Sequence, residues 1–278
     1  MAPRWPGAHL SAGRWARALE HLPSRRKLAY LRDLLREMVV RDLKLRYKRS
    51  LLGIAWSLLN PLAQLAVFTF LFGRVLKLGI PNYGPFVFAG SLAYSWFQSS
   101  LFAAATAITD NRELIKRPGF PAAILPVITV TTSLIQFLLA LPILLLFVLT
   151  GGAQLTATVL LLPLVIVIQF VLTLSLGYMV AALHVAFRDT QHLLGVALML
   201  LFYLTPVFYD ASIFPQRLRV IYYLNPLVHL VGAYRAVLTR GELPDMWSLL
   251  ILGISAAGLL WLGLTAFTRA SYGFVEEL

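Results

Sequence analysis

Long apolar runs constrain this chain more than any other feature of its sequence. Six stretches of roughly membrane-crossing length contain no carboxylate, and we predict a transmembrane helix in each. They are Leu51–Leu71, Phe86–Ile108, Ala122–Leu149, Leu155–Val185, Leu193–Phe208 and Trp247–Phe267. Only 13% of the 278 residues are charged, against roughly 25% in a soluble domain. The expected fold is therefore an all-α integral membrane protein with six transmembrane helices.

Basic residues are concentrated ahead of the first apolar run. Residues 1–49 hold 13 of the 24 Lys and Arg residues but only four acids. With the N-terminus inside, six spans place 18 basic residues on the inner side and six on the outer side. This asymmetry predicts that both termini are cytoplasmic. Nucleic-acid binding and a cleavable signal peptide are disfavoured, because hydrophobic spans follow and the first of them begins far from the N-terminus.

Residues 27–49 combine basic side chains with apolar side chains at helical spacing. The apolar positions are Leu28, Leu31, Leu34, Leu35, Met38, Val39 and Leu43. We predict a cytoplasmic amphipathic interface helix lying on the membrane surface, with a solvated cytoplasmic helix as the alternative. Residues 1–26 form an N-terminal extension, and residues 50–278 form the six-helix transmembrane domain.

Residues 209–246, between the fifth and sixth runs, are too long for a turn and rich in aromatic and aliphatic side chains. Pro215 and Pro226 divide the segment into pieces too short to cross a bilayer. We therefore predict re-entrant or interfacial helices here. A small external cap is the alternative.

Several kinds of chemistry lack their sequence signatures. The chain has no cysteine, which excludes disulfides and thiolate catalysis, and no G-x-x-x-x-G-K-[ST] loop for its own ATP hydrolysis. The five histidines show no metal-binding spacing. Without an acid inside a span, a proton- or sodium-coupled carrier is disfavoured. No Ser, His and acid cluster in one region, so an enzyme is possible but unsupported.

Polar uncharged and aromatic side chains remain inside the predicted spans. The polar ones include Gln64, Gln98, Ser99, Ser133, Gln136 and Gln169. Hydroxyl groups there commonly serve helix packing, and aromatic rings commonly form an interfacial belt. Sugar rings also stack on aromatic faces while their hydroxyls bond to polar groups, so a glycan passage needs the same mixture. Composition alone does not decide between these readings.

Five segments carry a resemblance to a known family. They are RDLKLRYKRSLLGIAWSLLNP at residues 41–61, DNRELIKRPGFP at 110–121, FRDT at 187–190, YYLNPL at 222–227 and FVEEL at 274–278. In this order, the chain from about residue 28 onward resembles the permease subunits of ABC transporters that export O-antigen, capsule and teichoic-acid polysaccharides.

The resemblance implies an ATP-driven exporter of lipid-linked polysaccharide, with O-antigen favoured, in the bacterial inner membrane. Two permease copies would form a homodimer with two copies of an ATPase subunit, which binds ATP and magnesium, and this chain would hold no cofactor or metal. The alternatives are an exporter of drugs or small lipids, a membrane-embedded glycan-modifying enzyme and a scaffold without a transport role.

The resemblance also implies site residues. The loop between spans two and three would dock the ATPase through Arg112, Glu113, Leu114, Ile115, Lys116, Arg117 and Phe120. An ordinary positive-inside anchor is the alternative interpretation of this loop.

Two further sets of side chains are expected to meet the substrate. The pyrophosphate of a lipid-linked glycan would meet the basic residues Arg41, Lys44, Arg46, Lys48 and Arg49, unless these contact only anionic lipid headgroups. The channel aromatics would be Phe68, Tyr94, Trp96, Phe97 and Tyr203.

Overall fold

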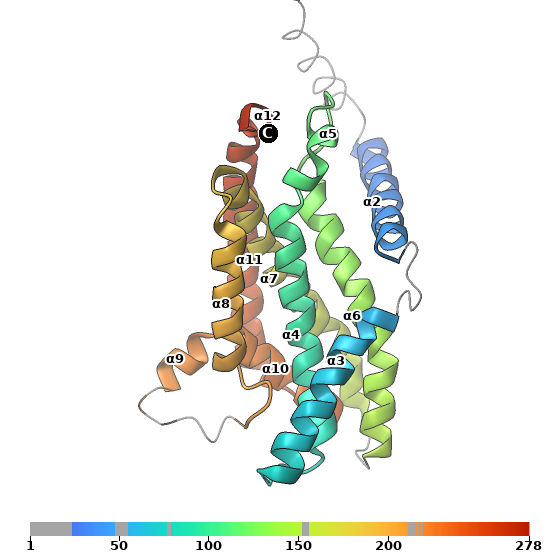
Figure 1. Cartoon of the computed structure of the whole chain (residues 1–278), viewed down its shortest axis with the longest axis vertical. Helices are drawn as coiled ribbons and strands as arrows, with labels where there is room; N and C mark the ends of the chain where they lie inside the picture. Colours follow the sequence, from blue (N-terminus) through green and yellow to red (C-terminus); the bar gives the residue numbers. More distant parts are fainter. Residues whose placement is uncertain are drawn as a thin grey trace, which may run out of the picture.

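The computed structural model describes residues 24–47, 55–76, 79–151, 156–210, 215, 217 and 219–277. These residues form helices and connecting turns, without a strand among them (Figure 1). The all-α prediction is confirmed for this part of the chain. Residues 1–23 of the predicted N-terminal extension lie outside the described residues, and residues 24–26 begin helix α2.

A helix occupies each of the six apolar runs. In chain order they are α3 (Ala55–Phe68) continued by η1 (Thr69–Val75), α4 (Tyr83–Thr106), α6 (Ile124–Thr150), α7 (Leu162–Ala186) preceded by η3 (Ala157–Leu161), α8 (Thr190–Leu204) and α11 (Met246–Ser271). Three helical segments are long and apolar enough to cross a membrane: Ile124–Thr150, Ala157–Ala186 and Met246–Ser271. Pro61–Val75 and Thr190–Leu204 are shorter apolar helices. The chain is thus a helical membrane protein, and the count of six spans stays a prediction.

Short elements join these helices at the two ends of the bundle. The turn η2 (Thr109–Asn111) and helix α5 (Arg112–Ile115) link α4 to α6, and α12 (Phe274–Glu277) follows α11. Figure 1 shows α5 and α12 at the same end of the molecule, called here the α5 end. At the opposite end, α9 (Arg219–Leu224), α10 (Pro226–Arg235) and η6 (Ala236–Arg240) fill the connection between α8 and α11.

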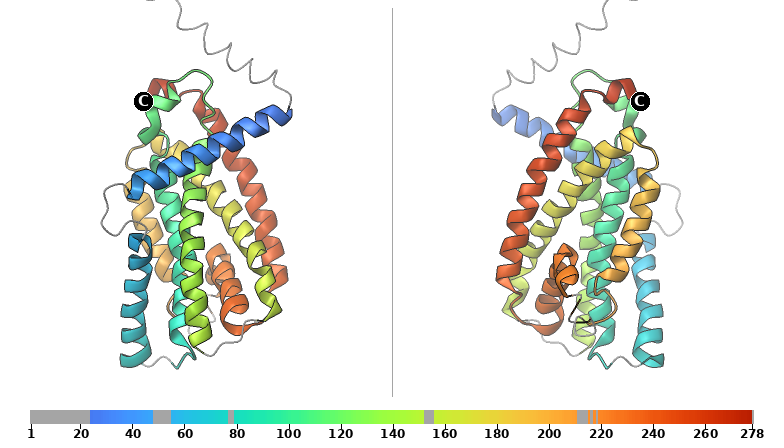
Figure 2. Two further views of the ribbon diagram at one scale, coloured as in Figure 1. Left: turned by 90° about the vertical axis from the view of Figure 1, so that its right-hand side faces the viewer. Right: turned by 90° about the vertical axis from the view of Figure 1, so that its left-hand side faces the viewer.

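The predicted interface helix is present as α2 (Ser24–Tyr47), and it lies across the bundle near the α5 end (Figure 2). The position of this helix at a membrane surface stays a prediction. Met38 and Val39 are buried in one cluster with Ile124 and Ile128 of α6, so this part packs on the chain's own bundle. Leu28, by contrast, is exposed.

Helix ends follow local chemical signals. The Asp245 carboxylate accepts the backbone N–H groups of Trp247 and Ser248 at 3.1 and 3.3 Å and thereby caps α11. The Ser248 hydroxyl also donates to this carboxylate, and that hydrogen bond lowers the pKa of Asp245. At α10, the side chain of Asn225 accepts the N–H of Leu227 at 3.0 Å. Pro226 lies at the start of the helix, where a backbone N–H would have no acceptor within the helix, so its missing N–H costs nothing.

Helix α4 is the centre of the bundle, since it contacts α3, α6, α7, α8 and α10. Helices α7 and α11 approach each other closely at Gly263. A Cβ atom on this glycine would lie 2.6 Å from the carbonyl oxygen of Ser175. Only a residue without a side chain allows this backbone contact, which is a common packing device between membrane helices.

The connection between α8 and α11 is folded into the bundle at the end opposite the α5 end. Helix α10 has ten residues, too few to cross a bilayer, yet Tyr234 and Arg235 at its end are 1% and 5% exposed. This agrees with short helices in place of a solvated loop. Their insertion into the membrane stays a prediction.

Candidate functional site

A polar cavity of about 410 Å³ lies between α3, α4 and α6. Half of its lining is amide or hydroxyl side chains and the remainder is apolar or aromatic. The lining residues are Pro61, Gln64, Leu92, Ser95, Trp96, Gln98, Ser99, Phe102, Ser133, Gln136, Phe137 and Ala140. None of them is charged, so the cavity suits a neutral, hydroxyl-rich ligand better than an ion.

Two polar atoms at this cavity are buried without a hydrogen-bond partner among the described residues. They are the indole Nε1 of Trp96 and the hydroxyl of Ser133. Trp96 is held in place by Phe137, whose ring centroid is 5.0 Å from that of the indole. Buried polar groups normally find a partner. Trp96 and Ser133 thus both line the cavity and each carry an unsatisfied polar atom.

The predicted channel aromatics separate into two places. Phe68, Tyr94 and Tyr203 come together around Phe202, whose ring centroid lies 6.2, 5.1 and 5.6 Å from theirs. This aromatic cluster connects α3, α4 and α8. Trp96 instead lines the polar cavity.

Burial distinguishes these aromatic side chains further. Tyr94 and Phe97 are each 2% exposed in the protomer, and the Tyr94 hydroxyl donates to the Leu198 carbonyl. Both side chains therefore pack the protomer's core. Tyr203 is 60% exposed. Contact of these residues with a passage stays a prediction.

The predicted docking loop forms η2 and α5 at the α5 end. Arg112, Glu113, Lys116 and Arg117 are exposed, and among the described residues none of them forms an ion pair. Ile115 is 9% exposed and belongs to the core under the loop. Its side chain anchors the loop and is not free to enter a partner's cleft.

The remaining apolar loop residues, Leu114 and Phe120, are partly buried against the same core as Ile115. The surface that the loop offers to a partner is therefore mainly polar.

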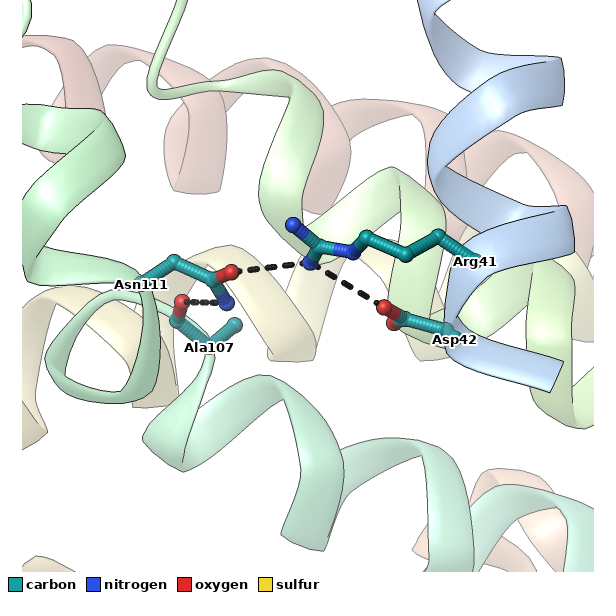
Figure 3. A network of polar contacts seen from close by, with 4 residues as sticks. All are labelled: Arg41, Asp42, Ala107 and Asn111. Atoms are coloured by element: carbon teal, nitrogen blue, oxygen red, sulfur yellow. Dashed lines mark hydrogen bonds and ion pairs between the residues drawn. The ribbon is translucent and has the colours of Figure 1, made fainter. Parts of the chain in front are cut away.

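Helix α2 is bonded directly to this loop (Figure 3). The guanidinium of Arg41 donates to the side-chain oxygen of Asn111 at 3.0 Å and to Asp42 at 3.2 Å. The Asn111 amide in turn donates to the carbonyl of Ala107 at 2.9 Å. Because Asn111 directly precedes α5, this hydrogen bond joins α2 to the loop. Sequence reasoning assigned Arg41 to a headgroup, and the structure gives it this structural contact.

The other predicted headgroup residues differ in position. Lys44 is exposed. Arg46 donates to the side-chain oxygen of Gln136 at 3.2 Å, which brings the end of α2 to the rim of the polar cavity. Lys48 and Arg49 lie outside the described residues. Headgroup binding by this set stays a prediction.

One buried cation was not singled out by sequence reasoning. Arg235 of α10 is 5% exposed, and its guanidinium donates to the carbonyls of Phe86 and Val207 at 3.1 and 2.7 Å. The available signal was an arginine in the apolar sequence that follows Pro226. Among the described residues, no three His, Asp or Glu side chains gather to hold a metal ion.

Comparison with known proteins identifies the family. The family described as ABC-2 type transporter matches residues 33–239, which is more than half of the chain. The chain belongs to the ABC-2 type transporter family. The matched region contains most of α2, the α5 loop, the polar cavity and α10.

Similar proteins cover almost the whole ABC-2 chain. The O-antigen export system permease protein RfbA of Myxococcus xanthus is 38% identical over 91% of this chain and 98% of its own length. A protein of the same name from Klebsiella pneumoniae is 31% identical over 90% of this chain and 97% of its own length. The polysialic acid transport protein KpsM of Escherichia coli is 22% identical over 83% of this chain and 90% of its own length.

Membership explains how an ABC-2 chain without a nucleotide-binding loop is energised. It is the membrane subunit of a transporter, and the ATPase is a separate subunit. The predicted family and the predicted transporter role are confirmed.

Proposed function

We propose that this chain is the membrane subunit of an ATP-driven exporter of lipid-linked polysaccharide, with O-antigen as the favoured cargo. It acts in the bacterial inner membrane with six spans, both termini in the cytoplasm and the segment around α10 re-entrant. Two copies form a homodimer that binds two ATPase subunits. The similarity to O-antigen permeases over nine tenths of the chain supports the cargo class.

The polar cavity between α3, α4 and α6 carries the proposal. Its uncharged amide and hydroxyl groups, with Trp96 beside Phe137, offer hydrogen bonds and an aromatic face to a sugar. A drug exporter would be expected to have a mainly apolar pocket. The six polar lining residues therefore favour a glycan over a drug or a small lipid.

The ATPase would act on the permease at the α5 end. Exposed charges on α5 would pair with the ATPase, and the Arg41–Asn111 hydrogen bond would carry its movement to α2. Arg46 would pass this movement on to Gln136 at the cavity. ATP binding shifts the permease between states only if the ATPase binds the two states with different affinity.

Replacement of one cavity amide tests the glycan assignment. Gln98→Leu removes a polar lining group at similar volume, whereas Thr106→Val removes a half-buried polar group on the same helix outside the cavity. Loss of one hydrogen bond worth about 1 kcal/mol predicts export slower by about fivefold in the first variant only. Surface polymer in a permease-deficient strain is measured, and co-purification of the ATPase reports assembly. Equal export by both variants would show that the glycan does not contact this cavity during export.

A further inference from the structure

A second, basic pocket lies apart from the polar cavity, at the α5 end of the bundle. It has a volume of about 310 Å³ and polar lining from three connections that are distant in sequence. These polar residues are Thr109, Arg112, His184, Arg188, Gln191 and Glu277. The α4–α6 connection, the α7–α8 connection and α12 thus meet around one hollow.

The pocket carries positive charge that the described chain does not neutralise. Arg112 and Arg188 contribute two guanidinium groups against the single carboxylate of Glu277. Among the described residues, no ion pair joins Glu277 to either arginine. Two like charges facing one hollow repel each other, so a bound anion would stabilise this arrangement.

His184 supplies a second and independent indication of a ligand. It is 7% exposed, and its Nδ1 is buried without a hydrogen-bond partner among the described residues. Buried polar atoms are normally hydrogen-bonded, so an unpartnered ring nitrogen on a residue that lines the pocket is an exception that a bound group could explain.

The start of α8 adds to the same field. Gln191 lies in its first turn, and no side chain caps this helix N-terminus. The N–H groups of Thr190 and His192 already donate to the carbonyls of Phe187 and Asp189, so what the start of α8 offers an anion is the positive end of the helix dipole. Arginine, imidazole and helix N-terminus therefore converge on one place.

We propose that this pocket binds a phosphate group, carried either by a membrane lipid headgroup or by a free phosphate or pyrophosphate. Two guanidinium groups and an imidazole that approach from different elements match a tetrahedral group with several oxygens. A single planar carboxylate would engage only one arginine in bidentate fashion. The bound group joins α5 to the α7–α8 connection and stiffens the predicted docking loop. The proposal holds for any exported cargo.

Titration of the purified full-length chain with inorganic pyrophosphate at constant ionic strength tests the site. Arg188→Gln removes one guanidinium from an exposed position, so the fold is preserved. Arg269→Gln makes the same charge change at an exposed position outside the lining. We expect Arg188→Gln to weaken pyrophosphate binding about tenfold or more, as the loss of a charge-assisted hydrogen bond predicts. Arg269→Gln should bind like the unaltered chain.

Hydrogen exchange provides a structural readout. Pyrophosphate should slow exchange of the backbone amides of residues 109–117 in the unaltered chain and in Arg269→Gln, but not in Arg188→Gln. The titration repeated in nanodiscs with and without phosphatidylglycerol identifies the source. Competition by this lipid supports the site with a headgroup as its occupant, and unchanged binding supports it with a free phosphate. Equal weakening by the two substitutions, or no binding at all, would overturn the proposal.

Discussion

The guanidinium carbon of Arg235 lies 3.4 Å from the centroid of the Phe86 ring. The same side chain donates to the carbonyls of Phe86 and Val207. One buried cation therefore joins α10 to the start of α4 and to the segment that follows α8. These elements are far apart in sequence, and no other described side chain bonds to all of them.

Replacement of Arg235 should destabilise the end of the bundle opposite the α5 end. Arg235→Met keeps much of the apolar volume but leaves the buried Val207 carbonyl without its arginine donor, at about 1–3 kcal/mol. We expect a clearly lower melting temperature in detergent, measured by thermal unfolding. Arg235→Lys keeps the charge but cannot reach both carbonyls with a planar fork, so its loss should be intermediate. A Met variant as stable as the unaltered chain would contradict this role.

Gly90 provides the space that this arginine occupies. A Cβ atom here would lie 3.0 Å from the Nη2 atom of Arg235 and 3.1 Å from the Val207 carbonyl oxygen. Gly90→Ala should therefore destabilise the fold by about 1–3 kcal/mol. Gly84→Ala is the matched control on the same helix, since nothing lies within 4 Å of its Cβ position. Equal melting temperatures for the two variants would show that the contact is easily relieved.

The pairing of α7 and α11 should depend on Gly263. Gly263→Ala would place a methyl group 2.6 Å from a backbone oxygen, so the helices must separate. Gly258→Ala on the same helix meets nothing within 4 Å and should be neutral or stabilising by up to about 1 kcal/mol through helix propensity. Thermal unfolding in detergent compares the two. Loss of stability in the Gly258 variant instead would refute the assigned contact.

The link between α2 and the docking loop should appear as energetic coupling. Arg41→Ala and Asn111→Ala each remove the 3.0 Å hydrogen bond of Figure 3, so the double variant should lose little more than either single variant. The readout is ATP hydrolysis by the complete transporter, with ATPase co-purification as the assembly control. We expect each single substitution to lower hydrolysis several-fold. Additive losses would mean that the two residues act separately.

The helices were predictable because their signal is local. The runs that became α4, α6 and α7 contain no Asp, Glu, Lys or Arg, and a chain segment inside a membrane has no alternative to helix for its backbone hydrogen bonds in such a run. Helix α2 was also predictable from its stripe. What the stripe packs on was not, because Met38 shares a buried cluster with Ile124 and Ile128 of α6, which lie 86 and 90 positions later in the chain.

The roles of single side chains depended on distant partners. The hydrogen bond of Arg41 could not be predicted, because its acceptor Asn111 is 70 residues away. Arg235 counted only as one basic residue near the outer face, whereas its acceptor at Phe86 is 149 residues away. The burial of Ile115 was also not predictable from the sequence around it. A four-residue helix has too few positions to reveal which side faces the core.

Transport by the reconstituted subunits tests the central claim most directly. Lipid-linked O-antigen is placed on the ATPase-facing side of vesicles that contain this chain, with or without its ATPase, and polymer that becomes accessible on the other side is measured. We predict ATP-dependent transfer only when both subunits are present. Transfer by this chain alone, or none with the ATPase and ATP present, would contradict its assignment as the membrane subunit of an O-antigen exporter.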